Sequence, residues 1–206
     1  MDGVFMKKLI KLILVGLLIT TIIGGFDLWK DRQLLKEKLI RLHIIGNSNS
    51  QEDQDIKLQL KDAIVSYLQP VVEKLPSKED AINYLNDNVE NIEKFANQVL
   101  DRLGVSDRAV VTIAPEAFDA REYNTFSLPS GIYDALKIRI GDAEGDNWWC
   151  VVFPNLCVSA SSTEFQDVAV SFGFSNSLTN TIIHRNGYQL RFFLLDCLGK
   201  LENILV

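Results

Sequence analysis

The segment Asn147–Cys157, NWWCVVFPNLC, constrains the fold more than any other stretch of this chain. Residues Trp148–Phe153 are mostly aromatic or β-branched and are followed by Pro154, a pattern that predicts a buried strand. A turn between this strand and the following residues would place Cys150 opposite Cys157. Cross-strand Cα atoms lie about 4.5–5.5 Å apart, within the reach of a disulfide. A Cys150–Cys157 bridge is therefore geometrically plausible.

The N-terminus indicates the compartment in which such a bridge would form. Lys7, Lys8 and Lys11 precede the uncharged run Leu12–Phe26, which is the pattern of an export signal. The run is shorter than the roughly 20 residues of a comfortable membrane span, yet no small-residue cleavage site stands out near its end. Both a cleaved signal peptide and a retained membrane anchor stay open for residues 1–26.

Charge and length restrict what the rest of the chain can be. The net charge is −6, and removing the lysine-rich N-terminus makes the balance more acidic, so nucleic acid is not an expected partner. The remaining residues, about 180, suit one domain with a hydrophobic core. We therefore expect a charged helical spacer over residues 27–38 and a single extracytoplasmic domain over residues 39–206.

Helices are predicted in the first half of this domain. After a strand at Leu39–Ile45, the turn Gly46–Ser50 leads into an amphipathic helix that Ser50 can cap with Asp53 three residues on. A second helix is predicted from Ser77 to Leu103, where apolar residues again recur at helical spacing.

Strands are predicted in the second half. Their expected ranges are Ala109–Ala114, Arg121–Ser127, Ile132–Ile140 and Trp148–Phe153. The fold class that follows is α+β, with a mostly antiparallel sheet covered by two long amphipathic helices.

The C-terminal part is predicted in three pieces. Glu164–His184 reads as a short helix with loops, Tyr188–Leu195 as a further strand, and Cys197–Leu205 as a closing amphipathic helix.

Candidate catalytic and metal-binding groups give weak patterns. Cys150 or Cys157 could act as a nucleophile with His43 or His184 as base and Asp134 or Asp196 orienting it, but thiolates are disfavoured inside an apolar run. Cysteines of exported chains are usually disulfide-bonded. The same two cysteines with His184 lack the common zinc spacing. We therefore predict no catalytic residue, no metal ligand and no cofactor.

Three other features bear on binding. The Gly46–Ser50 turn has one glycine and no following Lys-Ser or Lys-Thr pair, so helix capping is favoured over a phosphate cradle. His43 alternates with Leu42 and Ile44 and is expected to point outward, as an exposed strand residue or a contact residue. Trp148 and Trp149 are expected on opposite faces of their strand, one in the core and the other at the surface, under the C-terminal segment or at an interface.

Several motifs in a fixed order resemble one known family. They are Ile40–Ser50 followed by Glu52-Asp53-Gln54 and Lys57-Leu58, then Leu128–Gly131 with Tyr133, Ala135 and Leu136, then Asn147–Cys150 with Phe153-Pro154 and Leu156-Cys157, and finally Tyr188–Phe192. In these residues the chain, from about residue 39 to its C-terminus, resembles the stage II sporulation protein R family, signalling proteins of endospore-forming bacteria.

The resemblance implies a protein exported from the forespore into the space between two membranes. Family members act there on a membrane-embedded aspartic protease of the mother cell, which processes the precursor of sigma-E. The chain would then be a ligand and not an enzyme, and Cys150–Cys157 a structural disulfide. An exported cysteine-dependent cell-envelope hydrolase is the competing interpretation.

On this interpretation, we expect a partner-binding surface at the strand ends and the turn, where polar and large aromatic groups gather. Its candidate residues are Arg41, His43, Asn47, Asn49, Trp148 and Trp149.

Overall fold

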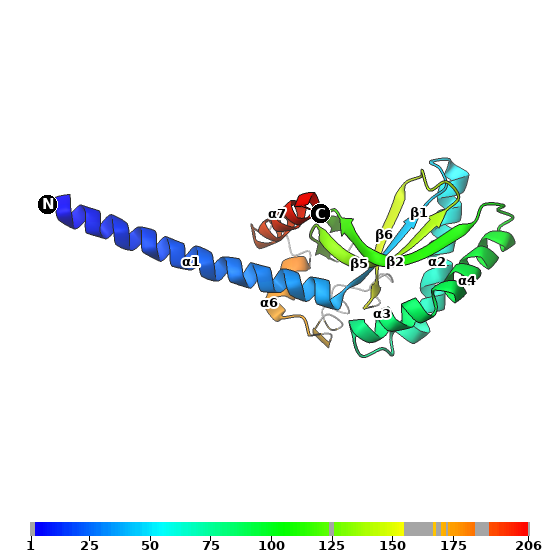
Figure 1. The fold of residues 1–206 in the computed structure, drawn as a ribbon, viewed down its shortest axis with the longest axis horizontal. Helices are drawn as coiled ribbons and strands as arrows, with labels where there is room; N and C mark the ends of the chain where they lie inside the picture. The colour runs from blue at the N-terminus through cyan, green and yellow to red at the C-terminus, as the bar shows by residue number, and fades with distance from the viewer. Residues whose placement is uncertain are drawn as a thin grey trace.

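The computed structural model describes residues 3–123, 126–154, 167, 170–171, 173–183 and 190–205 (Figure 1). Its helices are α1 (Gly3–Lys38), α2 (Gln51–Val72), α3 (Lys78–Asp87), α4 (Val89–Arg102), α6 (Asn176–Ile182) and α7 (Leu190–Leu205). Its strands are β1 (Ile40–Ile45), β2 (Ala109–Phe118), β3 (Arg121–Glu122), β4 (Ser127–Leu128), β5 (Gly131–Ile140) and β6 (Asn147–Phe153).

The main sheet has four strands in the order β2-β5-β1-β6. β1 lies antiparallel to β6 and parallel to β5, while β2 and β5 pair antiparallel. The one parallel pair needs a long connection, and the chain supplies it because α2, α3, α4 and β2 intervene between β1 and β5. The α+β class with a mostly antiparallel sheet is confirmed.

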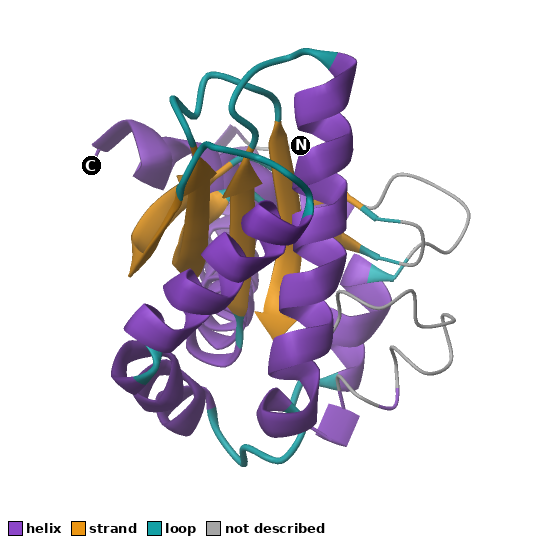
Figure 2. Cartoon of the chain, turned by 90° about the vertical axis from the view of Figure 1, so that its right-hand side faces the viewer, coloured by secondary structure: helices purple, strands orange, loops and turns teal. Residues whose placement is uncertain are grey.

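Helices cover both faces of this sheet. Figures 1 and 2 show α2, α3 and α4 on one face, with the end of α1 and the helices α6 and α7 on the other. Two hydrophobic clusters match these layers. Leu60, Ile64, Leu136 and Ile138 belong to the first, and Leu35, Phe118, Tyr133 and Leu195 to the second.

The predicted helix starts are confirmed, but the second helix is interrupted. The Ser50 side chain accepts a hydrogen bond from the Asp53 amide, and Ser77 does the same for Asp80. Between α3 and α4, Asn88 leaves helical geometry with φ −114° and donates its side-chain amide to the Tyr84 carbonyl at 2.9 Å. Asparagine competes with backbone hydrogen bonding in this way, so the apolar stripe continues across two helices.

Two predicted strands differ from the structure. Arg121–Ser127 is not one strand, because Tyr123 donates its amide to the Phe126 carbonyl and the flanking residues form the small β3–β4 pair. Within Tyr188–Leu195, the described residues from Leu190 onward begin α7, so the strand prediction is wrong there. The mostly apolar run LRFFLL is compatible with both the strand period of two and the helix period of 3.6, and in the structure it packs as a helix. The predicted helix at Cys197–Leu205 is confirmed as the rest of α7.

The first helix joins the N-terminal apolar segment to the domain. From residue 8 to residue 38, α1 is long and apolar enough to cross a membrane, as judged by length and composition, a property that export signals share. Its last turns, predicted as a spacer, pack Leu35 into the second core, and Leu39 at the entry to β1 is equally buried. The helix therefore runs without a break into the globular part.

Candidate partner-binding surface

The turn before α2 is joined to the loop between β5 and β6. The Asn47 side-chain oxygen accepts from the Asp142 amide at 2.9 Å, and that of Asn49 accepts from the Asp146 amide at 2.6 Å. A Cβ atom on Gly145 would lie 2.3 Å from the Ser48 carbonyl oxygen, so only glycine permits this close approach. The two asparagines thus fix one loop against the other.

Residues of the first turns of α2 support this junction from below. Asp53 accepts hydrogen bonds from the Ser48 hydroxyl at 2.5 Å and from the Asn47 amide at 3.2 Å. The Ser48 hydroxyl bond is the main reason that the pKa of Asp53 lies below its usual value. The Lys57 ammonium donates to the Asp146 carbonyl at 2.8 Å, and burial lowers the pKa of Lys57. The turn is a capped helix start, with its polar groups engaged by the protein.

His43 is buried, with 3% of its surface exposed, so the expectation that it points into solvent is wrong. Its Nδ1 lies 2.9 Å from Glu116 Oε2 and its Nε2 lies 2.7 Å from Asn147 Oδ1. The imidazole also stacks on the Trp149 ring with centroids 3.7 Å apart. Asn147 and Trp149 come from the neighbouring strand β6, and Glu116 from β2, one strand beyond β5, which is why alternation within β1 alone did not reveal them.

Arg41 is fully buried under the second helical layer. Its Nε donates to the Cys150 carbonyl at 3.2 Å and one terminal nitrogen donates to the Tyr123 hydroxyl at 2.8 Å. The guanidinium lies over the Phe118 ring at 4.3 Å from the centroid, a cation–π contact that partly offsets the cost of burying the charge. Arg41 therefore holds β1, β2 and β6 together from within.

Trp148 and Trp149 lie on opposite faces of β6, as predicted. Trp149 packs against the second core between His43 and Phe118, with its ring centroid 4.8 Å from that of Phe118. Trp148 is 36% exposed at the rim of the other face, and the Lys61 ammonium lies 5.0 Å from its ring centroid. Of the two tryptophans, Trp148 offers more surface to another molecule.

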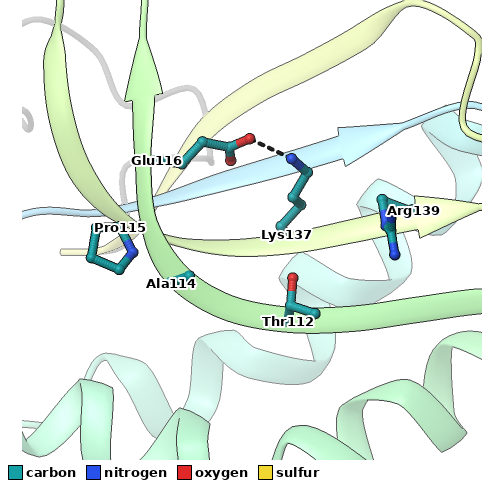
Figure 3. A pocket seen from close by; sticks show the side chains of 6 residues that line it. All are labelled: Thr112, Ala114, Pro115, Glu116, Lys137 and Arg139. Carbon is teal, nitrogen blue, oxygen red and sulfur yellow. Dashed lines mark hydrogen bonds and ion pairs between the residues drawn. The ribbon is translucent and has the colours of Figure 1, made fainter. Parts of the chain in front are cut away.

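Glu116, the partner of His43, lines a shallow hollow over β2 and β5 (Figure 3). Its volume is about 300 Å³, and its lining includes Thr112, Glu116, Lys137 and Arg139 from β2 and β5. The Lys137 ammonium lies 2.5 Å from Glu116 Oε1. Although burial raises the pKa of Glu116, hydrogen bonds from His43 and Lys137 outweigh it and hold that pKa below its usual value. No pattern within a single strand indicates this group of side chains, because it forms only once the β2–β5 register is set.

The six candidate residues therefore form two groups. Asn49 and Trp148 are exposed, and Asn47 and Trp149 are half-buried, with Trp149 on the opposite face of β6 from Trp148. Arg41 and His43 lie beneath and reach a partner only through the residues that they position. That these residues form a binding surface stays a prediction.

The chemistry expected of an enzyme finds little support in the described residues. Cys150 is disulfide-bonded, which removes the thiolate that a nucleophile requires. Asp134 pairs with Lys78 at 2.6 Å, and Asp196 is held by Ser130 and Lys200. No cluster of metal-binding side chains is present among the residues that the structure describes. Cys157 and His184 lie outside those residues, so the Cys150–Cys157 pairing stays a prediction, and Cys197 is a free thiol.

A family model described as "Stage II sporulation protein R" matches residues 36–163, which is more than half of the chain. The chain belongs to this family. It is 31% identical over 124 residues to the stage II sporulation protein R of Bacillus subtilis (strain 168). That alignment covers 60% of this chain and spans 55% of the relative's length. No solved structure matches the chain significantly.

The matched region contains β1, the α2 turn, the hollow and β6, so the candidate surface lies within the part that defines the family. Family membership supports a role in sporulation.

Proposed function

We propose that this protein is an exported sporulation signal that activates a membrane-embedded aspartic protease of the mother cell, leading to processing of the sigma-E precursor. Family membership is the observation that carries the proposal. The α1 segment is consistent with it, because export signals and membrane anchors both have this length and composition. The site of action is then the space between the forespore and mother-cell membranes.

The surface at the ends of β1 and β6 is suited to act as the ligand face. Trp148 and Asn49 are exposed there on a backbone that is held from three directions, since Asn47, Lys57 and His43 all fix the loops around them. A rigid aromatic group beside polar groups is typical of the residues that dominate binding energy at interfaces. On this proposal, Arg41, His43 and Asn47 position the face, and Asn49, Trp148 and Trp149 contact the protease.

Activation requires more than binding. A ligand shifts its receptor toward the active state only when it contacts that state more favourably than the inactive one. A signalling domain of this kind needs no catalytic group of its own, and the disulfide state of Cys150 agrees with that.

The test is reconstitution in a host that does not sporulate. The full chain, the candidate protease and the sigma-E precursor are co-expressed, and cleavage of the precursor is followed by immunoblotting. Processing that depends on both the chain and the protease supports the proposal. Processing that needs only the protease, or none with all three partners present, overturns it.

A further inference from the structure

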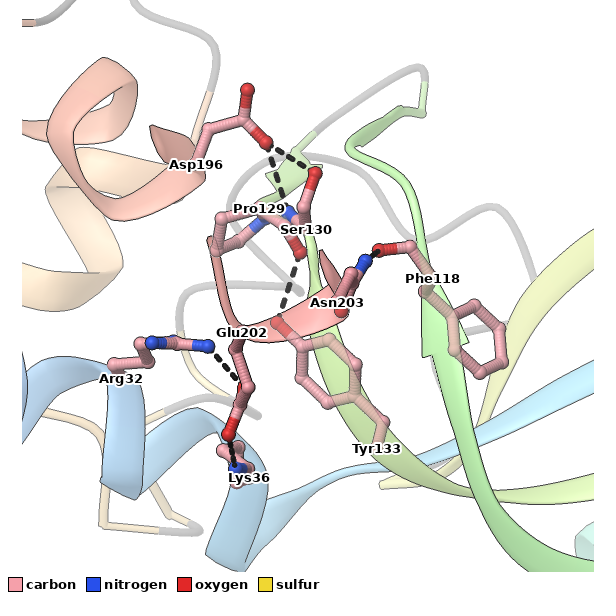
Figure 4. A network of polar contacts seen from close by, with 9 residues as sticks. All are labelled: Arg32, Lys36, Phe118, Pro129, Ser130, Tyr133, Asp196, Glu202 and Asn203. Carbon is pink, nitrogen blue, oxygen red and sulfur yellow. Dashed lines mark hydrogen bonds and ion pairs between the residues drawn. The ribbon is translucent and has the colours of Figure 1, made fainter. Parts of the chain in front are cut away.

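The C-terminal helix α7 turns several polar side chains inward, beside Leu195 in the second core (Figure 4). Asp196 accepts from the Ser130 amide at 3.0 Å, and Asn203 donates to the Phe118 carbonyl at 3.0 Å. Glu202 pairs with Lys36 at 2.7 Å and also with Arg32. Gly199 lies on the same inner side, where a Cβ atom would lie 1.7 Å from the Ser130 carbonyl oxygen. The inner face is thus fixed by specific polar contacts and one close backbone approach.

The outer face of α7 is mostly apolar, with the exposed Lys200 at its edge, whereas an ordinary surface helix exposes a polar face. Leu201, Ile204 and Leu205 are 57%, 79% and 84% exposed. Phe193 and Leu194, about two turns before Leu201 on the same side, are also exposed. Leu201 follows Leu194 by seven residues and precedes Ile204 and Leu205 by three and four, so all five lie on one side of the helix, with the half-buried Cys197 between the two groups. A continuous exposed apolar stripe of this kind marks a surface that another apolar phase covers.

The position of α7 relative to α1 indicates what covers these exposed apolar residues. Arg32 and Lys36, to which Glu202 is bound, follow Phe26 by roughly two to three helical turns, about 9–15 Å along the axis. Phe26 and Trp29 stack with centroids 6.0 Å apart and are both exposed, at the end of the apolar part of α1. Aromatic side chains of this kind concentrate at the boundary of a bilayer.

We propose that the outer face of α7 lies on the lipid surface from which α1 emerges. Lipid is favoured over a protein partner because Glu202 joins α7 to the part of α1 that directly follows its exposed apolar segment, which ends at Trp29. An apolar helix face binds lipid by entering the boundary between headgroups and acyl chains. The contact between Glu202 and the two basic residues of α1 then fixes the domain relative to the membrane. The candidate ligand face on β6 would be held at a defined height and orientation. This inference concerns the chain that retains α1 and does not depend on the proposed function.

The free thiol of Cys197 allows a direct test, because it lies on α7 beside the apolar stripe. The full chain, labelled there with an environment-sensitive nitrobenzoxadiazole fluorophore, is reconstituted in phosphatidylethanolamine–phosphatidylglycerol nanodiscs. Some of the lipids carry bromine near the headgroup end of the acyl chains. Labelling of the Cys197→Ser chain measures any uptake at other cysteines. A matched control carries the label at Asn91→Cys in that background, at an exposed position on α4 in the opposite helical layer.

We expect the label at Cys197 to lose most of its emission to brominated lipid and to emit at shorter wavelength than the label at position 91, which keeps its emission. Leu201→Glu together with Ile204→Glu should reverse both effects, and circular dichroism verifies that this variant is folded. Equal emission with and without brominated lipid at Cys197 overturns the proposal. So does a Cys197–Cys197 cross-link that forms in the nanodisc without quenching, since a second copy would then cover α7.

Discussion

At the scale of single residues, His43 shows how this domain combines charge with burial. The imidazole joins β1 to Glu116 of β2 and Asn147 of β6, and it lies on the Trp149 ring. Glu116 in turn binds Lys137. A chain of polar contacts therefore crosses the whole sheet within a layer that is otherwise hydrophobic, and each polar group supplies a partner for the next.

Replacing His43 with alanine removes two hydrogen bonds and an aromatic stack. We expect the free energy of unfolding to fall by about 2–4 kcal/mol, because the Glu116 carboxylate also loses a partner in a half-buried site. Urea denaturation measures it. The matched control is Val110→Ala, an exposed position on β2 whose loss should stay within about 0.5 kcal/mol. Equal losses in the two variants would contradict the role assigned to His43.

Acid should weaken the fold partly through Glu116. Its folded-state pKa lies below the usual 4.5, so the folded protein binds fewer protons than the unfolded chain in that range. The stabilisation is fully present above pH 4.5 and is lost as the pH falls through the lowered folded value. In urea titrations between neutral pH and pH 3, Glu116→Gln should therefore lose less stability on acidification than the wild type. Parallel losses would show that Glu116 does not contribute, and that Asp53, Asp196 and Glu202, whose pKa values are also lowered, carry the effect.

At the scale of elements, the strands and helix caps follow from local patterns, while their partners do not. Ser50 and Ser77 cap helices as predicted, because an N-cap depends on residues three apart in the sequence. The Asn88 break, the helical state of Leu190–Leu195 and the burial of His43 depend on contacts with distant elements. The hollow by Glu116 depends on strand register, and no single-strand pattern contains it. The sequence therefore indicates most residues of the candidate site, but only a small part of how they are arranged and which of them are buried.

The packing of α7 against the start of β5 can be tested at Gly199, which lies against the Ser130 backbone. Gly199→Ala adds a Cβ atom into the space of the Ser130 carbonyl, so α7 must move away from β5. We expect a loss of at least about 1–3 kcal/mol in the free energy of unfolding, measured in detergent solution. Leu205→Ala, on the exposed side of the same helix, serves as the control and should change little. A neutral Gly199→Ala would mean that α7 is not seated as described.

The predicted Cys150–Cys157 bridge can be tested at the same scale. A closed loop of this length stabilises a fold by about 2–3 kcal/mol in the chain-entropy model. Cys150→Ser, Cys157→Ser and the double variant should lose the same free energy of unfolding under oxidising conditions, because each breaks the same bond. Unequal losses would point to a different partner for Cys150.

At the scale of the whole molecule, the continuous helix α1 joins the N-terminal apolar segment directly to the domain. Leu35 and Leu39 seat its end in the second core, and Lys36 ties it to α7. A retained α1 would thus hold the domain rigidly, so that the exposed Trp148 at the start of β6 would stand at a fixed height above the bilayer. A cleaved α1 would release the same face to diffuse.

Precursor processing by single-site variants at matched protein levels shows directly whether Asn49, Trp148 and Trp149 form the ligand face. Trp148→Ala should lower affinity for the protease by about 30-fold, as expected for loss of an aromatic anchor, and should reduce processing toward background. Val110→Ala, an exposed apolar residue on the opposite sheet edge, should leave processing unchanged. Full processing by a chain in which Asn49, Trp148 and Trp149 are all alanine, and which remains folded, would contradict the account.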